Sequence, residues 1–130
     1  MSLLIDIRQT DHVVVLEVTG RLSIVEPALR HVAWELIQSG ERYLIINLGR
    51  VSYLDNSGLG QLCWIYTVLR NRGGDMVLLK PTARIRTMLE ITKLNTVFHS
   101  FDTEADATAF VRTFRSTVSA YAPSDIEVLP

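Results

Sequence analysis

The sequence predicts an α/β fold in which helices pack on a mixed β-sheet. Runs of aliphatic and β-branched residues of strand length alternate with segments of helical period, in the order β-β-α-β-α-β-α-β-α. Such alternation is typical of a sheet covered by helices. The 130 residues are close to the common size of one domain, and no linker-like shift in composition divides them. We therefore expect one domain over residues 1–120 and a C-terminal tail over 121–130.

The N-terminal part of the chain predicts two strands and a helix. Residues 3–8 and 13–18 are rich in strand-forming side chains, and a turn at residues 10–11 indicates a hairpin. Residues 23–26 have the spacing of a capping box, and Pro27 fits the first turn of the helix that follows. The helix is marked by apolar residues at helical spacing: Leu29, Val32, Ala33, Leu36 and Ile37.

The middle of the chain predicts strand, helix and strand. Gly40 ends the first helix, and the near-continuous apolar run 43–48 is expected to be a covered strand. A loop then leads to an amphipathic helix over 57–72. Residues 76–79 form the next strand, which ends before Pro81.

The C-terminal part predicts two helices around a weaker strand at 97–101. A short helix is marked by Ile85, Met88 and Leu89. Asp102 or Thr103 can cap the final helix. Its expected core face consists of Ala107, Phe110, Val111, Phe114 and Val118. Residues 121–130 lack periodicity, which is why we expect a tail there.

Composition excludes several classes of function. Thirteen basic residues nearly balance fourteen acidic ones, and no basic run interleaves with aromatic residues, so we expect no nucleic-acid partner. No secretory segment opens the chain and no apolar run is long enough to cross a bilayer, which predicts a cytoplasmic protein without a membrane partner. Cys63 is the only cysteine, and we expect it to be an inert buried thiol. The three histidines, at 12, 31 and 99, lie in unrelated elements and predict no metal site.

A polar cluster, residues 55–57, separates an apolar run from the second predicted helix. Asp55, Asn56 and Ser57 are the residue types that cap helix N-termini, because their side-chain oxygens accept from unpaired backbone N–H groups. Capping alone would explain them. Such an end also favours anions, and a hydroxyl exposed there would suit a charge switch.

The helix after this cluster carries two apolar stripes. One consists of Leu59, Leu62, Cys63 and Tyr66, and we expect it to be buried against the sheet. The opposite one consists of Ser57, Gln61, Trp64 and Val68. This second stripe has two explanations: the region around Val97 or the C-terminal tail covers it, or it is a surface for another protein. Trp34, with Arg30 on its side of the first helix, is expected to pack on the sheet edge.

The sequence contains no catalytic motif that we could identify. A nucleophile elbow needs Gly two residues before its Ser, and Asp55 occupies that position before Ser57. Gly58 and Gly60 begin a dinucleotide fingerprint that Cys63 interrupts, and no phosphate-loop Gly-Lys-Ser/Thr occurs. We therefore expect a protein that is not an enzyme, without catalytic residues or a cofactor.

The motif segments resemble those of the STAS family, named for sulphate transporters and anti-sigma factor antagonists. The matching residues include Tyr53-Leu54-Asp55, with Gly58, Leu59 and Gly60 opening a helix that ends near Arg72-Gly73-Gly74. Gly20-Arg21-Leu22 matches a second, weaker motif before the first helix. The resemblance covers roughly residues 3 to 115 and is strongest to the freestanding bacterial anti-sigma factor antagonists.

This resemblance implies a cytoplasmic regulator of transcription that binds an anti-sigma factor with serine kinase activity and so frees the sigma factor. In switchable relatives the kinase phosphorylates the antagonist and breaks the complex, and a serine phosphatase restores it. The implied partner-binding residues here are Ser23, Asp55, Asn56, Ser57, Gln61, Trp64 and Val68. Two other roles stay open: a non-phosphorylated STAS scaffold in a larger assembly, and a small-ligand sensor that holds an anion at the helix N-terminus.

The sequence departs from the family pattern around this surface. The phospho-acceptor position is Asn56, and an amide cannot be phosphorylated. Ser57, one position later, is the alternative phosphosite, but a kinase aligns its substrate hydroxyl and a one-residue shift turns the side chain by about 100°. Ser23 stands where the family has an acidic residue. We therefore expect an antagonist without the usual switch. We also expect Trp64 to be partly exposed, so that its removal weakens partner binding and leaves stability nearly unchanged.

Overall fold

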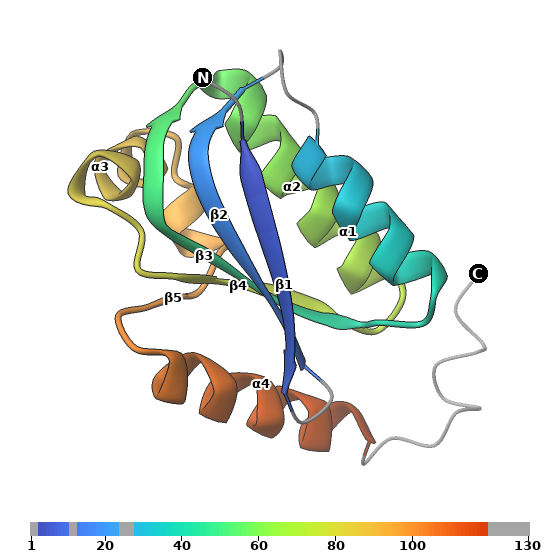
Figure 1. Ribbon diagram of the computed structural model, residues 1–130. Coiled ribbons are helices and arrows are strands. Elements are labelled where there is room, and N and C mark those ends of the chain that lie inside the picture. The colour runs from blue at the N-terminus through green and yellow to red at the C-terminus, as the bar shows by residue number, and fades with distance from the viewer. Residues whose placement is uncertain (1–2, 11–12, 24–27, 120–130) are drawn as a thin grey trace.

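Five strands form one sheet in the order β1-β2-β3-β4-β5 (Figure 1). The computed structural model describes residues 3–10, 13–23 and 28–119, with side chains up to residue 114. β1 pairs antiparallel with β2 and the other neighbours are parallel, so the predicted hairpin and mixed sheet are confirmed. The strands are β1 Leu4–Thr10, β2 Val13–Leu22, β3 Tyr43–Leu54, β4 Asp75–Leu79 and β5 Ser100–Phe101.

Helices cover both faces of this sheet. The predicted element order is confirmed: the helices are α1 Ala28–Gln38, α2 Asn56–Asn71, α3 Ala83–Ile91 and α4 Glu104–Ser119, with a short 3-10 turn, η1, at Leu94–Thr96. Alternate strand residues point to opposite faces. Leu16 and Ile46 pack with α1, α2 and α3, whereas Val15 and Ile45 pack with α4. Figure 1 accordingly shows α1 and α2 side by side on one face and α4 on the other.

β3 is longer than predicted. The expectation of a strand over 43–48 followed by a loop is wrong, because β3 continues to Leu54. Its second half pairs with the end of β2, with Arg50 opposite Thr19 and Leu54 opposite Leu22, across two irregularities in register. Gly49 and Arg50 interrupt the apolar run without ending the strand. Only one residue, Asp55, therefore separates the sheet from α2.

Three further expectations change in detail. The last strand is confined to Ser100–Phe101, because η1 and a turn occupy the residues before it. Cys63 and Tyr66 are only half-buried. Ile65 and Leu69 join Leu59 and Leu62 on the core face of α2 instead. The core face of α4 is confirmed where its side chains are described, since Ala107 and Val111 are fully buried and Phe110 and Phe114 pack beside them.

Some predictions fall outside the described residues. They are the capping box beyond Ser23, Pro27 in the first helical turn, the turn residue Asp11, His12 and the tail over 121–130. Within residues 3–10, 13–23 and 28–119, the His, Cys, Asp and Glu side chains form no cluster of three that could hold a metal ion. In the same part of the chain, every helix is too short or too polar to cross a membrane.

Candidate functional site

The N-terminus of α2 is capped by Asp55 and presents Asn56 to solvent. Asp55 has extended backbone angles, and its Oδ1 accepts from the N–H of Gly58 at 2.8 Å. The capping expectation is thus confirmed for Asp55. Asn56 is exposed and Ser57 is half-buried. In the described part of the chain, no side chain hydrogen-bonds to the Ser57 hydroxyl.

Two glycines in the first turns of α2 serve different purposes. A Cβ on Gly58 would lie 2.1 Å from the Leu22 carbonyl oxygen and 2.8 Å from a Leu54 methyl carbon. Only glycine therefore allows α2 to begin directly against the end of β2. Gly60 is exposed, and a Cβ there would meet nothing within 4 Å. Glycine lowers helix stability at such a position, and no described residue lies close enough to exclude a side chain there.

Gln61 ties α2 to the segment that joins β2 and α1. Its side chain is 7 % exposed. Its Nε2 donates to the Ser23 carbonyl at 2.9 Å, and its Oε1 accepts from the backbone N–H of Arg30 at 3.2 Å. Ser23 is also buried. The structure brings these two predicted site residues together beneath the surface, where they position the backbone around the start of α1.

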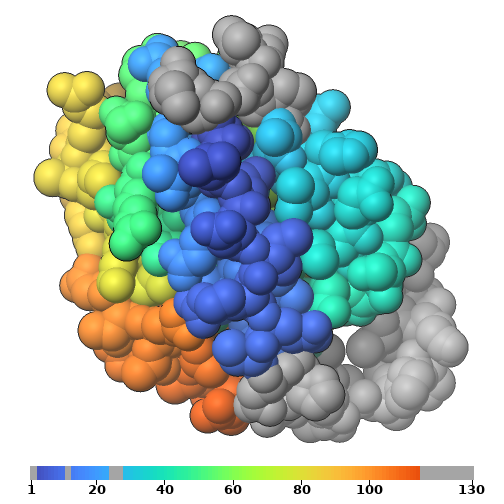
Figure 2. All heavy atoms as spheres, in the orientation of Figure 1, coloured from blue at the N-terminus to red at the C-terminus, as the bar shows by residue number. Residues whose placement is uncertain are grey.

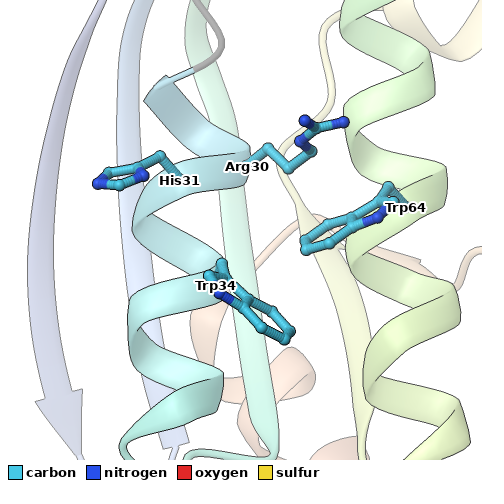
Figure 3. Close-up of a pocket in the computed structure, with 4 residues that line it drawn as sticks. All are labelled: Arg30, His31, Trp34 and Trp64. Carbon is cyan, nitrogen blue, oxygen red and sulfur yellow. The ribbon is translucent and has the colours of Figure 1, made fainter.

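A basic, aromatic groove lies farther along α1 and α2. The rings of Trp34 and Trp64 meet edge to face with centroids 5.7 Å apart. The guanidinium of Arg30 lies 5.3 Å from the Trp64 ring, and that of Arg72 lies 5.4 Å from the Trp34 ring. Both are cation–π distances. A cavity of about 290 Å³ opens between the helices, lined by Arg30, His31, Trp34 and Trp64 (Figure 3).

The two tryptophans were expected in different surroundings. Trp34 packs against Trp64 of α2, a contact that the sequence analysis did not predict. Trp64 is half-buried and packs against Trp34 of α1. The sequence analysis had considered only the region around Val97 or the C-terminal tail as its cover. Helical spacing placed both rings off the main core stripes, but it contains no information on which helices are neighbours. Val68 is half-buried along the same side of α2.

The charges around this groove are unbalanced. In the described part of the chain, neither Arg30 nor Arg72 forms an ion pair with a carboxylate. Glu35 lies 3.7 Å from His31 on the solvent side of α1. Burial raises the pKa of the Cys63 thiol, which agrees with an unreactive cysteine. The described residues around the groove thus present two guanidiniums beside two indole rings.

Comparisons with known proteins agree with this architecture. The family model of the STAS domain matches residues 5–107. The chain is 31% identical over 100 residues to an anti-sigma-B factor antagonist of Staphylococcus aureus (strain NCTC 8325 / PS 47), covering 76% of this chain and 93% of that protein. A putative anti-sigma factor antagonist from Thermotoga maritima superposes with a TM-score of 0.78 at 25% identity, over 83% of this chain and 94% of the other. An anti-sigma factor antagonist from Mycobacterium paratuberculosis gives 0.77 at 27% identity, over 85% and 95%.

Proposed function

The chain belongs to the STAS domain family, and we propose that it is a cytoplasmic anti-sigma factor antagonist whose partner is an anti-sigma factor with serine kinase activity. The observation that carries this proposal is the likeness to the anti-sigma-B factor antagonist, which spans 93% of that relative. The geometry supports it, because Asp55 caps α2 and leaves Asn56 and Gly60 exposed at the start of the helix.

The proposed contact surface is centred on Asn56 and Gly60. These residues are one helical turn apart, so they share a face of α2, and both are exposed. A glycine kept at an open helical position leaves room for a partner backbone to approach closely. Asp55 fixes the direction of the helix start, and Ser57 flanks it. The buried pair, Ser23 and Gln61, acts indirectly by holding the neighbouring backbone in place.

The groove extends this surface along α1 and α2. Trp64 and Val68 supply apolar area, and the guanidiniums of Arg30 and Arg72, which form no ion pair with the described residues, attract carboxylates. Tryptophan and arginine are the residue types most enriched among binding hot spots. We propose that the partner places an apolar side chain flanked by acidic residues there.

The proposed complex lacks the usual phospho-switch. A phosphoryl group at the start of α2 would add about two negative charges to a fitted surface and so weaken the complex. Asn56 has no hydroxyl to accept it. Ser57 is the alternative acceptor, but it lies about 100° around the helix from Asn56 and is half-buried. The wild-type protein would then behave as a permanently unmodified antagonist, and a serine phosphatase would have no substrate in it.

Capture and calorimetry test this proposal. Tagged wild-type chain is used to capture partners from lysate of the source cells, and mass spectrometry should identify an anti-sigma factor with a kinase fold. The purified pair is then titrated. Asn56→Asp should weaken binding at least about tenfold, since it places a charge at the centre of the surface.

Asn71→Asp is the matched control, because it makes the same change at the exposed far end of α2. It should bind like the wild type. Equal affinities for wild type and Asn56→Asp would contradict the proposed surface. Recovery of a large homo-assembly without an anti-sigma factor would instead favour the scaffold role.

A further inference from the structure

β1 is an edge strand with exposed apolar side chains. Among the described residues it pairs with β2 on one side only, and its other edge faces the viewer in Figure 1. Leu4 is 63% exposed and Ile7 is 52% exposed. These are two of the four large hydrophobic residues that are exposed in the described part of the chain, and β1 is only seven residues long. Its side chains form a continuous strip on the surface in Figure 2.

The two faces of β1 differ in character. Ile5 and Ile7 lie opposite Val18 and Leu16, which belong to the core beneath α1 and α2. Asp6 and Arg8 lie on the other face, opposite Glu17 and Val15, on the side of α4. An edge strand leaves a row of backbone N–H and C=O groups available to another strand.

We propose that β1 pairs antiparallel with β1 of a second copy of this chain, about a two-fold axis that passes beside Ile7. The proposal is independent of the proposed function, because none of the β1 residues that it pairs belongs to the proposed contact surface. A two-fold axis perpendicular to the sheet keeps each face on its own side, so the α4 layers and the α1–α2 layers of both copies remain continuous. It produces a closed, self-complementary interface.

The sequence of β1 favours one register of this pairing. Ile7 is the midpoint of Leu4–Thr10, so centring there uses all seven residues. Ile7 then meets its own copy, Leu4 meets Thr10, and Asp6 meets Arg8 in two equivalent ion pairs. Centring on Asp6 would place two carboxylates opposite each other, and centring on Arg8 would place two guanidiniums opposite each other. Like charges directly across strands are destabilising, whereas opposite charges and apolar pairs are stabilising.

Arg8 retains a donor for this contact. Its terminal nitrogens bind Glu17 at 2.7 Å and Glu104 at 2.6 Å. A guanidinium has five N–H donors, and in the described part of the chain the Nε–H of Arg8 has no acceptor. Asp6 forms no ion pair within the described residues. Pairing of two β1 strands would therefore place the Asp6 carboxylate beside a guanidinium and cover the Ile7 side chain.

Disulfide trapping tests both the dimer and its register. All variants carry Cys63→Ala, so that the introduced thiol is the only one in the chain. Directly opposed Cα atoms in antiparallel strands are about 4.5–5.5 Å apart, which a disulfide can bridge. Ile7→Cys should therefore cross-link to a covalent dimer under mild oxidation. Asp6→Cys alone should not, because its two copies lie diagonally, about 7–8 Å apart. A mixture of Asp6→Cys and Arg8→Cys chains should give the heterodimer.

Ile91→Cys is the control for random collision, because Ile91 is 75% exposed on α3, far from β1 in sequence. It should cross-link at least about tenfold more slowly than Ile7→Cys. Sedimentation of the wild-type chain should show a concentration-dependent dimer that Ile7→Lys abolishes and Ile91→Lys leaves intact. Equal cross-linking of Ile7→Cys, Asp6→Cys and Ile91→Cys, or a monomer at every concentration, would overturn the proposal.

Discussion

Gly58→Ala and Gly60→Ala make the same chemical change two residues apart on α2, and the structure predicts opposite effects on stability. At Gly58 the new methyl carbon would lie 2.1 Å from the Leu22 carbonyl oxygen and 2.8 Å from its carbon. Both atoms belong to the backbone of β2, so relief requires α2 or the strand end to move. Overpacking of this kind costs about 1–3 kcal/mol, and a backbone obstacle puts the expected loss near the upper value, about 3 kcal/mol.

At Gly60 the added methyl meets nothing within 4 Å, so only the backbone effect remains. Alanine is more favourable than glycine in a helix by about 0.8–1.0 kcal/mol. For a chain of this size, about 1 kcal/mol shifts the melting temperature by about 4 °C. We therefore expect Gly58→Ala to melt about 12 °C below the wild type and Gly60→Ala about 4 °C above it.

Thermal and urea unfolding of the three proteins measure these differences, with affinity for the anti-sigma factor as a second readout. Gly60→Ala should be more stable yet bind more weakly, because its methyl group projects from the proposed contact surface. Such a result separates binding from folding. A Gly58→Ala chain as stable as the wild type, or a Gly60→Ala chain as destabilised as Gly58→Ala, would refute the packing argument.

Three further substitutions test other parts of the structure. Burial raises the pKa of Asp75, so its charged form opposes folding above that pKa. Asp75→Asn should therefore increase the free energy of unfolding, measured in urea at neutral pH. This gain should fade as the pH falls through the raised pKa toward the ordinary carboxyl range. Gln61→Ala leaves the buried Ser23 carbonyl without its donor and should cost about 1–3 kcal/mol in the same assay. Trp64→Ala removes a half-buried ring from Trp34 and should cost about 1–2 kcal/mol by thermal melting, in contrast to the unchanged stability expected from sequence.

Local patterns predicted the element order well, and long-range pairing explains where they failed. Apolar periodicity located at least part of each of the strands β1 to β5 and the helices α1 to α4, because the buried face of a helix repeats every three to four residues and that of a strand every two. The second half of β3 was missed because Gly49 and Arg50 carry no strand signal. Arg50 is held by pairing with Thr19 near the end of β2, and Gly49 lies at an irregularity in the register. A parallel partner from another part of the chain cannot be read from a local window.

In the candidate site, too, local signals were predicted correctly and contacts between distant segments were missed. Asp55 was predicted as a cap from its residue type and position, and its bond to Gly58 confirms it. The buried role of Gln61 was not predicted, because helical spacing grouped it with Trp64 on an apparently outer face. The contact between α1 and α2 buries Gln61, which accepts from the backbone N–H of Arg30, and it also pairs Trp34 with Trp64. Two tryptophans on successive helices, each off its core stripe, were the signal available in the sequence.

The most direct test of the proposed function follows the complex with the kinase anti-sigma factor in the presence of Mg²⁺ and ATP. Size-exclusion chromatography and intact mass are measured together for wild type and Asn56→Ser. We predict that the wild-type chain stays unmodified and bound, whereas Asn56→Ser gains one phosphoryl group and dissociates. Near-complete phosphorylation of the wild type with loss of the complex, both abolished by Ser57→Ala, would contradict it and place the switch one residue along.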